Sequence, residues 1–214
     1  MQNNYCTLYV VRHGQTDWNV KKLIQGHLDI PLNQTGEGQA KELGDKLKPI
    51  HFDAVFSSDL LRAKRTAELI SLEREIIIQT TEALRERHFG TFQGKHVNEF
   101  GQKTLQTLFK DFESMPIDEQ KKYGDFESTK KYTGRFLQFL REIAIAYEGK
   151  TVLIVTHGGP MKFLLDRMGF SGDKTIAEFA IKNTAYIKLE SDGVDFFIKE
   201  TFGIENKLSS QNRG

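Results

Sequence analysis

The sequence predicts an α/β fold, a three-layer sandwich with a mainly parallel central sheet and helices on both faces. Short β-prone runs alternate with segments of helical periodicity along the 214-residue chain. The runs 7–11 (Thr-Leu-Tyr-Val-Val) and 151–155 (Thr-Val-Leu-Ile-Val) are apolar on both faces, which is typical of strands buried in a parallel sheet. The length allows one sizeable core, so we expect a single domain over residues 1–206.

The first half of the chain supplies three expected strands and two expected helices. Thr35 is the expected N-cap of the first helix, and Leu61, Ala63 and Ala67 are among the apolar positions of the second. In chain order we expect a strand at 7–11, a helix at 36–47, a strand at 54–56, a helix at 59–72 and a strand at 76–78.

Two more helices flank the apolar run at 151–155. The first is predicted to face the core, because Phe136, Leu140, Ile143 and Tyr147 recur at helical spacing. The second follows the strand and extends to about Met168. Pro160 suits its first turn, and Gly169 suits its C-terminal end.

Three segments depart from this alternation. Asp192-Gly193 predicts a hairpin at the sheet edge, between strands at 185–190 and 194–199. The charged stretch at about 95–132 has no clear strand, and we expect it to form a small helical insertion over the sheet. Residues 207–214 are expected to be a disordered tail.

Composition and charge exclude several classes of function. The formal net charge of +1 does not favour nucleic acid or an anionic membrane as partner. The single cysteine excludes an internal disulfide, and neither a signal peptide nor a membrane-length apolar run is visible. We therefore expect a cytoplasmic protein that acts on a small molecule as a monomer or homodimer.

Two strands are predicted to end in the same way, in a histidine followed by a glycine. The first runs into Arg12-His13-Gly14 and the other into His157-Gly158. Ligands of open α/β sheets bind beyond the carboxyl ends of the strands, and a glycine there lets the backbone approach the ligand. The two histidines are therefore expected at one edge of the sheet.

An arginine and a carboxylate are expected at the same edge. Arg62 lies just inside the helix that follows the strand at 54–56, and Glu86 follows another strand. Guanidinium groups match the oxygens of a phosphoryl group, and each charge-assisted hydrogen bond contributes about 1.5–3 kcal/mol. A neutral imidazole is a competent nucleophile, and a carboxylic acid can protonate a leaving oxygen. The set predicts phosphoryl chemistry.

Cys6 and Arg12 have the spacing used by cysteine-dependent phosphatases, but their context argues against that chemistry. It needs a loop whose amides wrap the phosphate. The five intervening residues contain no glycine and favour a strand, which would place Cys6 roughly 20 Å from Arg12.

The ordered set of motifs resembles the histidine phosphatase superfamily, in its phosphoglycerate-mutase-like branch. The resemblance covers about residues 5–190, and its first motif, at 8–19, is the most specific. The matching stretches are 8–19 (Leu-Tyr-Val-Val-Arg-His-Gly-Gln-Thr-Asp-Trp-Asn), 25–26, 31–36, 57–63, 66–67, 84–86, 89–90 and 156–159.

The resemblance implies a role for each matching residue. His13 would be the nucleophile that carries the phosphoryl group, and Glu86 would protonate the leaving oxygen and then activate water. Around the phosphate the resemblance implies Arg12, Arg62, His157 and Asn19, and near the rest of the substrate Gln25 and Gly26. It implies neither a metal ion nor an organic cofactor. Glu127-Ser128 with Arg135 resembles a helix start found in many phosphatase members, with Phe126 in place of the usual glycine.

The favoured function is hydrolysis of small phosphomonoesters such as sugar phosphates. The alternatives are phosphoglycerate-mutase-type transfer and dephosphorylation of a phosphoprotein. Residues 95–132 lack the Arg-Arg-Ser-Tyr run that such mutases carry, which favours hydrolysis. A catalytically dead binding module would have lost at least one of His13, Arg62, Glu86 or His157, and all four are present.

Overall fold

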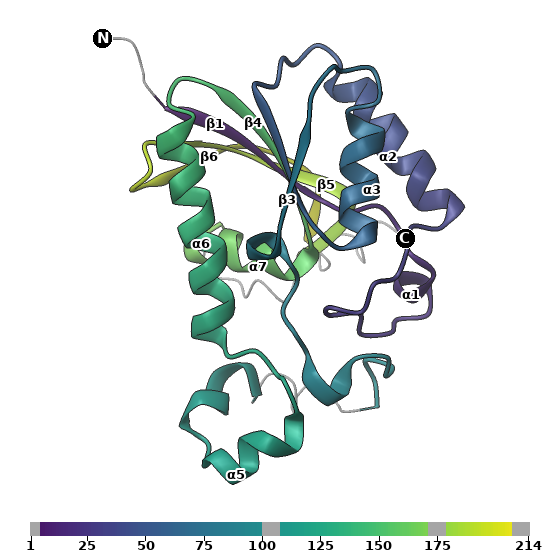
Figure 1. Cartoon of the computed structure of the whole chain (residues 1–214), viewed down its shortest axis with the longest axis vertical. Helices are drawn as coiled ribbons and strands as arrows, with labels where there is room; N and C mark the ends of the chain where they lie inside the picture. The colour runs from purple at the N-terminus through teal and green to yellow at the C-terminus, as the bar shows by residue number, and fades with distance from the viewer. Residues whose placement is uncertain (1–4, 100–107, 171–178, 207–214) are drawn as a thin grey trace.

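A computed structural model describes residues 5–99, 108–170 and 179–206 and contains one mixed six-stranded sheet (Figure 1). The strand order is β3-β2-β4-β1-β5-β6. Strands β1 to β4 pair in parallel, whereas β5 is antiparallel to β1 and β6 to β5. The strands are β1 (Cys6–Arg12), β2 (Ala54–Ser58), β3 (Ile78–Thr81), β4 (Thr151–Thr156), β5 (Phe179–Ser191) and β6 (Phe196–Asn206).

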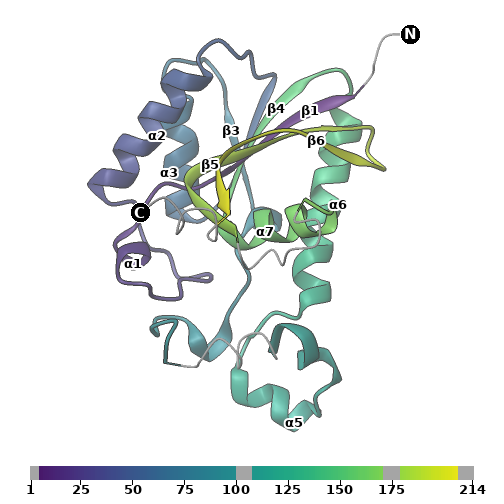
Figure 2. The same ribbon diagram turned by 180° about the vertical axis from the view of Figure 1, so that it is seen from behind.

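Helices cover both faces of the sheet, as the two opposite views show (Figures 1 and 2). On one face lie α2 (Gln34–Leu47) and α3 (Leu61–Ile70), and on the other α6 (Thr129–Ala146) and α7 (Gly158–Arg167). The three-layer α/β sandwich predicted from the sequence is confirmed. None of the helices in the described ranges has the length and apolar character needed to span a bilayer.

Strand β1 is buried between the two helical layers. Leu8 and Val10 pack in the cluster that contains α6 and α7, whereas Tyr9 and Val11 pack in the cluster that contains α2 and α3. This alternation follows from the two-residue period of a strand, and burial on both faces explains why the run is continuously apolar.

The parallel register of β1 and β4 determines where the two histidines emerge. Val11 pairs with Val155 and Arg12 with Thr156, so His13 and His157 leave adjacent strands at the same level. The backbone N–H of His13 donates to the carbonyl of Thr156 at 2.9 Å, which extends the pairing to the edge of the site.

Several predicted boundaries were wrong by a few residues. Helix α2 begins at Gln34 with Asn33 as its N-cap, not Thr35, because the Asn33 side chain accepts from the N–H of Gly36 at 2.9 Å. Helix α3 begins two residues later than predicted, because Leu60 has an extended backbone. The third strand lies at Ile78–Thr81, where it pairs with β2, and not at 76–78.

The stretch at about 95–132, expected to be an insertion, overlaps helix α6, which begins at Thr129 and includes Tyr132. Its described part contains short helical turns that include Phe112–Ser114 and α5 (Ile117–Gln120). An aromatic cluster fills this region, built on Phe92, Leu108, Phe112 and Phe126, and Ile24 packs into it. Residues 100–107 and the predicted tail 207–214 lie outside the described residues.

Candidate active site

A cavity of about 170 Å³ opens at the carboxyl ends of β1 and β4. All five residues predicted as catalytic line it, and so do four of the five predicted substrate-binding residues. These nine are Arg12, His13, Asn19, Gln25, Gly26, Arg62, Glu86, His157 and Gly158. The residues come from segments that are far apart in the chain, and the parallel sheet brings them to one edge.

The proton of the His13 ring is fixed by the backbone. Nδ1 lies 2.7 Å from the carbonyl oxygen of Gly14, and a carbonyl can only accept, so Nδ1 carries the proton and Nε2 keeps its lone pair. Burial lowers the pKa of His13 well below its usual value, and the charges of Arg62 and Arg12 lower it further. The ring is therefore neutral at neutral pH.

His157 is fully buried beside His13, and neither of its ring nitrogens has a hydrogen-bond partner among the described residues. The two rings lie edge to face, with centroids 5.2 Å apart. Burial lowers the pKa of His157, and Arg62 and His13 add to the effect. Buried polar atoms are almost always paired in native proteins, so this imidazole is suited to contacting a ligand in the cavity.

Arg62 is held by the loop that precedes α2. Nη1 donates to the carbonyl of Leu28 at 2.8 Å and Nη2 to that of Gly26 at 2.7 Å, while the buried Nε has no partner within the part of the chain that the structure describes. Burial lowers the pKa of Arg62 to about 10, which leaves the guanidinium charged at neutral pH. Arg12 is held in a similar way, through a hydrogen bond from Nη1 to the carbonyl of Ile181, and its buried Nε also finds no partner in residues 5–99, 108–170 and 179–206.

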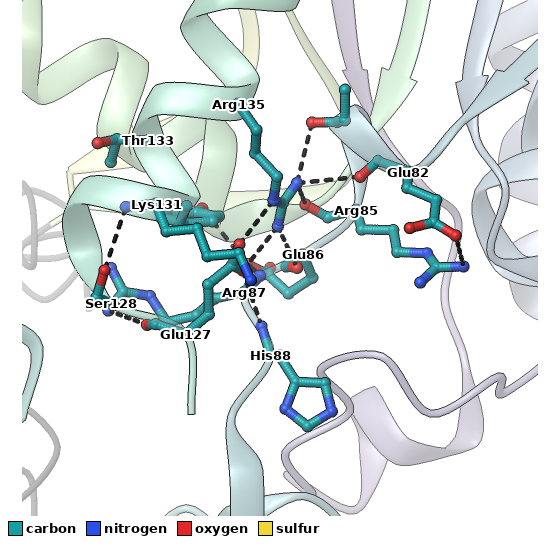
Figure 3. A network of polar contacts seen from close by, with 12 residues as sticks. Glu82, Arg85, Glu86, Arg87, His88, Glu127, Ser128, Lys131, Thr133 and Arg135 are labelled. Atoms are coloured by element: carbon teal, nitrogen blue, oxygen red, sulfur yellow. Dashed lines mark hydrogen bonds and ion pairs between the residues drawn. The ribbon is translucent and has the colours of Figure 1, made fainter. Parts of the chain in front are cut away.

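Glu86 reaches the cavity from the segment that follows β3. Its carboxylate accepts from the backbone N–H of Arg87 at 2.9 Å and from that of Gly159, in the first turn of α7, also at 2.9 Å. The segment around Glu86 is enclosed by a polar network that includes Glu127 and Arg135 (Figure 3). Glu86 thus lies at the N-terminus of α7, with its carboxylate oxygens positioned by two backbone N–H groups.

The predicted substrate-binding residues differ in what they contact. Asn19 lines the cavity, but its Oδ1 accepts from Thr16 in the capping box of α1 (Asp17–Val20). Gln25 has a buried Oε1 that no other described residue contacts through a hydrogen bond. Gly14 does not line the cavity. Its N–H donates to Thr66 at 2.9 Å, and a side chain at residue 14 would collide with the carbonyl of Gly36.

The cavity as a whole is suited to a tetrahedral anion. Two guanidinium groups and two imidazoles face it, and their unpartnered nitrogens supply hydrogen-bond donors and a lone pair. Charge-assisted bonds from such groups are the strongest that a protein offers to a phosphoryl oxygen.

Comparison with known proteins agrees with this geometry. A sequence model of the histidine phosphatase superfamily (branch 1) matches residues 8–202. The chain belongs to the histidine phosphatase superfamily. The resemblance found in the sequence is therefore confirmed, and the protein is a phosphoric monoester hydrolase of the histidine phosphatase type.

This histidine phosphatase is similar over nearly its whole length to proteins of known sequence or structure. It is 34% identical to a Bacillus subtilis protein named uncharacterized phosphatase PhoE, across 94% of this chain and 95% of that protein. A phosphoglycerate mutase structure from Bacillus anthracis superimposes with a TM-score of 0.77 at 26% identity, covering 94% of each chain. A phosphoserine phosphatase from Entamoeba histolytica, solved with 3-phosphoglyceric acid, gives 0.75 at 25% identity, covering 94% of this chain and 99% of that one.

Sequence analysis of this phosphatase missed Leu23 and Ile24, which line the cavity, and Asn183, which supports it. The Asn183 side chain donates to the backbone carbonyl of His13 at 3.1 Å and to Asn19 Oδ1 at 3.3 Å. It lies in β5 where the register with β6 shifts between Ile181 and Tyr186. Irregular pairing of this kind re-aims side chains, and no local sequence signal marks it.

Cys6 has no part in the site of this phosphatase. It begins β1 and is fully buried, whereas Arg12 ends the same strand. Burial and the nearby charge of Asp53 raise the pKa of the Cys6 thiol to about 12, so it is not a nucleophilic thiolate near neutral pH.

Proposed function

We propose that this phosphatase hydrolyses small phosphorylated metabolites, such as sugar phosphates, through a phosphohistidine intermediate on His13. The observation that carries the proposal is the state of the His13 ring. Its Nδ1–H donates to Gly14, which leaves the Nε2 lone pair free to attack phosphorus.

The first step transfers the phosphoryl group to the enzyme. The Nε2 lone pair of His13 forms a bond to phosphorus as the bond from phosphorus to the ester oxygen breaks. Glu86 donates a proton to that oxygen, which departs as an alcohol. Arg12, Arg62 and His157 stabilise the charge on the non-bridging oxygens.

The second step returns the enzyme to its starting state. Glu86, now a carboxylate, accepts a proton from a water molecule that attacks phosphorus. The bond from phosphorus to Nε2 breaks, its electron pair returns to His13, and inorganic phosphate leaves. No further reactant is needed.

The space beside the site supports a small substrate. A second cavity of about 380 Å³ adjoins the first and shares Arg12, Glu86, Phe89 and Gly158 with it. A phosphoryl group in the first cavity would therefore extend its organic part past Glu86 into the second. The similar Entamoeba enzyme, whose structure holds 3-phosphoglyceric acid, supports a substrate of this size.

The experiment is a phosphate-release assay across a panel of phosphorylated metabolites, with wild-type protein and His13→Ala. We expect free phosphate from one or more small phosphomonoesters with the wild type and none with the variant, whose fold is checked by circular dichroism. Equal release by the variant would refute the assignment. Conversion of phosphoglycerate to its positional isomer without phosphate release would instead indicate a mutase.

A further inference from the structure

Arg135 connects helix α6 to the segment that carries Glu86. It lies two turns into the helix, and its guanidinium group reaches the backbone of that segment (Figure 3). It donates to four carbonyl oxygens, those of Glu82 at 3.2 Å, Ala83 at 2.9 Å, Arg85 at 2.8 Å and Glu86 at 2.8 Å. Nη1 shares its two N–H groups among three of these carbonyls. His27 and Thr156 contact the carbonyls of Glu86 and Leu84, so Arg135 is one of several side chains that hold this segment, and it makes the most contacts with it.

Glu127 holds the other edge of the same guanidinium group. Nε and Nη2 of Arg135 donate to its two carboxylate oxygens at 2.8 and 2.9 Å. Burial opposes the charge of Glu127, but the ion pair outweighs burial and the pKa of Glu127 is lowered. The backbone N–H of Glu127 also donates to the carbonyl of His88 at 2.8 Å. The pair therefore holds the chain on both sides of Glu86.

Neither Arg135 nor Glu127 donates to or accepts from the carboxylate of Glu86. That carboxylate accepts from the N–H groups of Arg87 and Gly159, both at 2.9 Å, and from the Tyr132 hydroxyl at 3.5 Å. The geometry at Gly159 requires the backbone of residues 86 and 87 to lie at a fixed distance from helix α7. Arg135 holds that backbone through its bonds to the carbonyls of Arg85 and Glu86, beside the contact of His27 with the carbonyl of Glu86.

We propose that Arg135, braced by Glu127, is a positioning residue that holds Glu86 where it can protonate the leaving oxygen. This inference rests on the proposed function, because it takes Glu86 to be the proton donor. It makes Arg135 important for the departure of the alcohol rather than for binding of the phosphate.

A purely structural role for Arg135 makes a different prediction. Loss of fold stability would lower the amount of active enzyme and would affect every substrate equally. Loss of positioning would affect substrates according to how much their leaving group needs a proton. A nitrophenolate is a good leaving group and departs without being protonated, whereas the alkoxide of an alkyl phosphate needs a proton to depart.

The test is a double-mutant cycle on the full chain with Arg135→Ala, Glu86→Gln and both together. Each protein is assayed with 4-nitrophenyl phosphate and with glycerol 3-phosphate. We expect Arg135→Ala to lower kcat on glycerol 3-phosphate at least about tenfold more than on 4-nitrophenyl phosphate, with little change in KM. In the Glu86→Gln background the same substitution should cost less than about threefold, because the donor is already lost.

Two results would overturn the proposal, and they are distinguishable. Equal losses on both substrates with Arg135→Ala, or losses that multiply in the double variant, would make Arg135 a structural residue and leave the role of Glu86 intact. Equal losses on both substrates with Glu86→Gln would remove Glu86 as the proton donor and the positioning proposal with it.

Further variants keep the test valid if Arg135→Ala folds poorly. Glu127→Gln keeps the shape of the side chain that pairs with Arg135 but removes its charge. It should give a smaller loss of kcat that is still larger on glycerol 3-phosphate than on 4-nitrophenyl phosphate. Equal losses on both substrates would contradict the proposal. The matched control is Arg74→Ala, which removes an arginine that donates to the carbonyls of Leu47 and Ile50, away from the site. It should leave the ratio between the two substrates unchanged.

Discussion

The imidazole rings of His13 and His157 lie edge to face with their centroids 5.2 Å apart and an interplanar angle of 61°. Both are buried, and the pKa of each is lowered, first by burial and then by Arg62. Two protonated rings at this separation would repel each other. The arrangement is therefore one of two neutral imidazoles that share a single small cavity.

Both histidines should stay neutral at a pH where an ordinary histidine is protonated. A ring with the reference pKa of about 6.5 is roughly three-quarters protonated at pH 6.0. Because the folded-state pKa of both rings is lowered, a smaller fraction of either should be protonated there. Titration of the ring nitrogens by ¹⁵N NMR measures this, with assignments from His13→Asn and His157→Asn. A midpoint at or above pH 6.5 for His13 would contradict the arrangement.

Replacement of Arg62 by lysine should reduce activity although the charge is kept. A lysine has only three N–H donors. If two of them bond to the carbonyls of Gly26 and Leu28, one is left for the phosphoryl group, whereas the arginine keeps more than one. Loss of one charge-assisted bond to the phosphoryl group corresponds to a fall in kcat/KM of about 10–150-fold. Arg65→Ala is the matched control, since Arg65 lies on the exposed side of the same helix and pairs with Glu37. Equal activity of Arg62→Lys and wild type would contradict the role of Arg62.

Gly159→Ala should impair proton donation without unfolding the protein. A Cβ at this position would lie 2.1 Å from Glu86 Oε1 and 2.7 Å from the Tyr132 hydroxyl, so the carboxylate must move. We expect kcat on alkyl phosphates to fall at least about tenfold, at the lower end of what general acid catalysis contributes. Gly134→Ala is the control, because a Cβ there meets nothing within 4 Å. A wild-type kcat for Gly159→Ala would show that Glu86 tolerates displacement.

The sequence was informative where function depends on the ends of strands. His13 and His157 could be placed at one edge because both follow continuously apolar runs, and parallel strands present their carboxyl ends together. Arg62 could be placed because it follows the next strand by only a few residues. In each case a short apolar run identifies a strand, and the end of that strand determines where the following side chain lies.

The sequence was uninformative where contacts join distant segments. Asn33 and Thr35 are both good N-caps, and the choice between them depends on a hydrogen bond from the Asn33 N–H to the carbonyl of Gln15. Asn183 reaches His13 only because the pairing of β5 is irregular. Arg135 contacts the carbonyl of Glu86 across 49 positions of the chain, which no periodicity reveals.

The most direct test of the account is to identify the atom that carries the phosphoryl group. Protein mixed rapidly with a ³²P-labelled phosphomonoester is quenched in alkali, where phosphohistidine survives. The labelled peptide is sequenced to find the residue, and its alkaline hydrolysate is compared with phosphohistidine standards to find the ring nitrogen. We predict acid-labile phosphate on Nε2 of His13, and no label in His13→Ala. Label on His157, or unchanged turnover by His13→Ala with no labelled enzyme, would contradict the account.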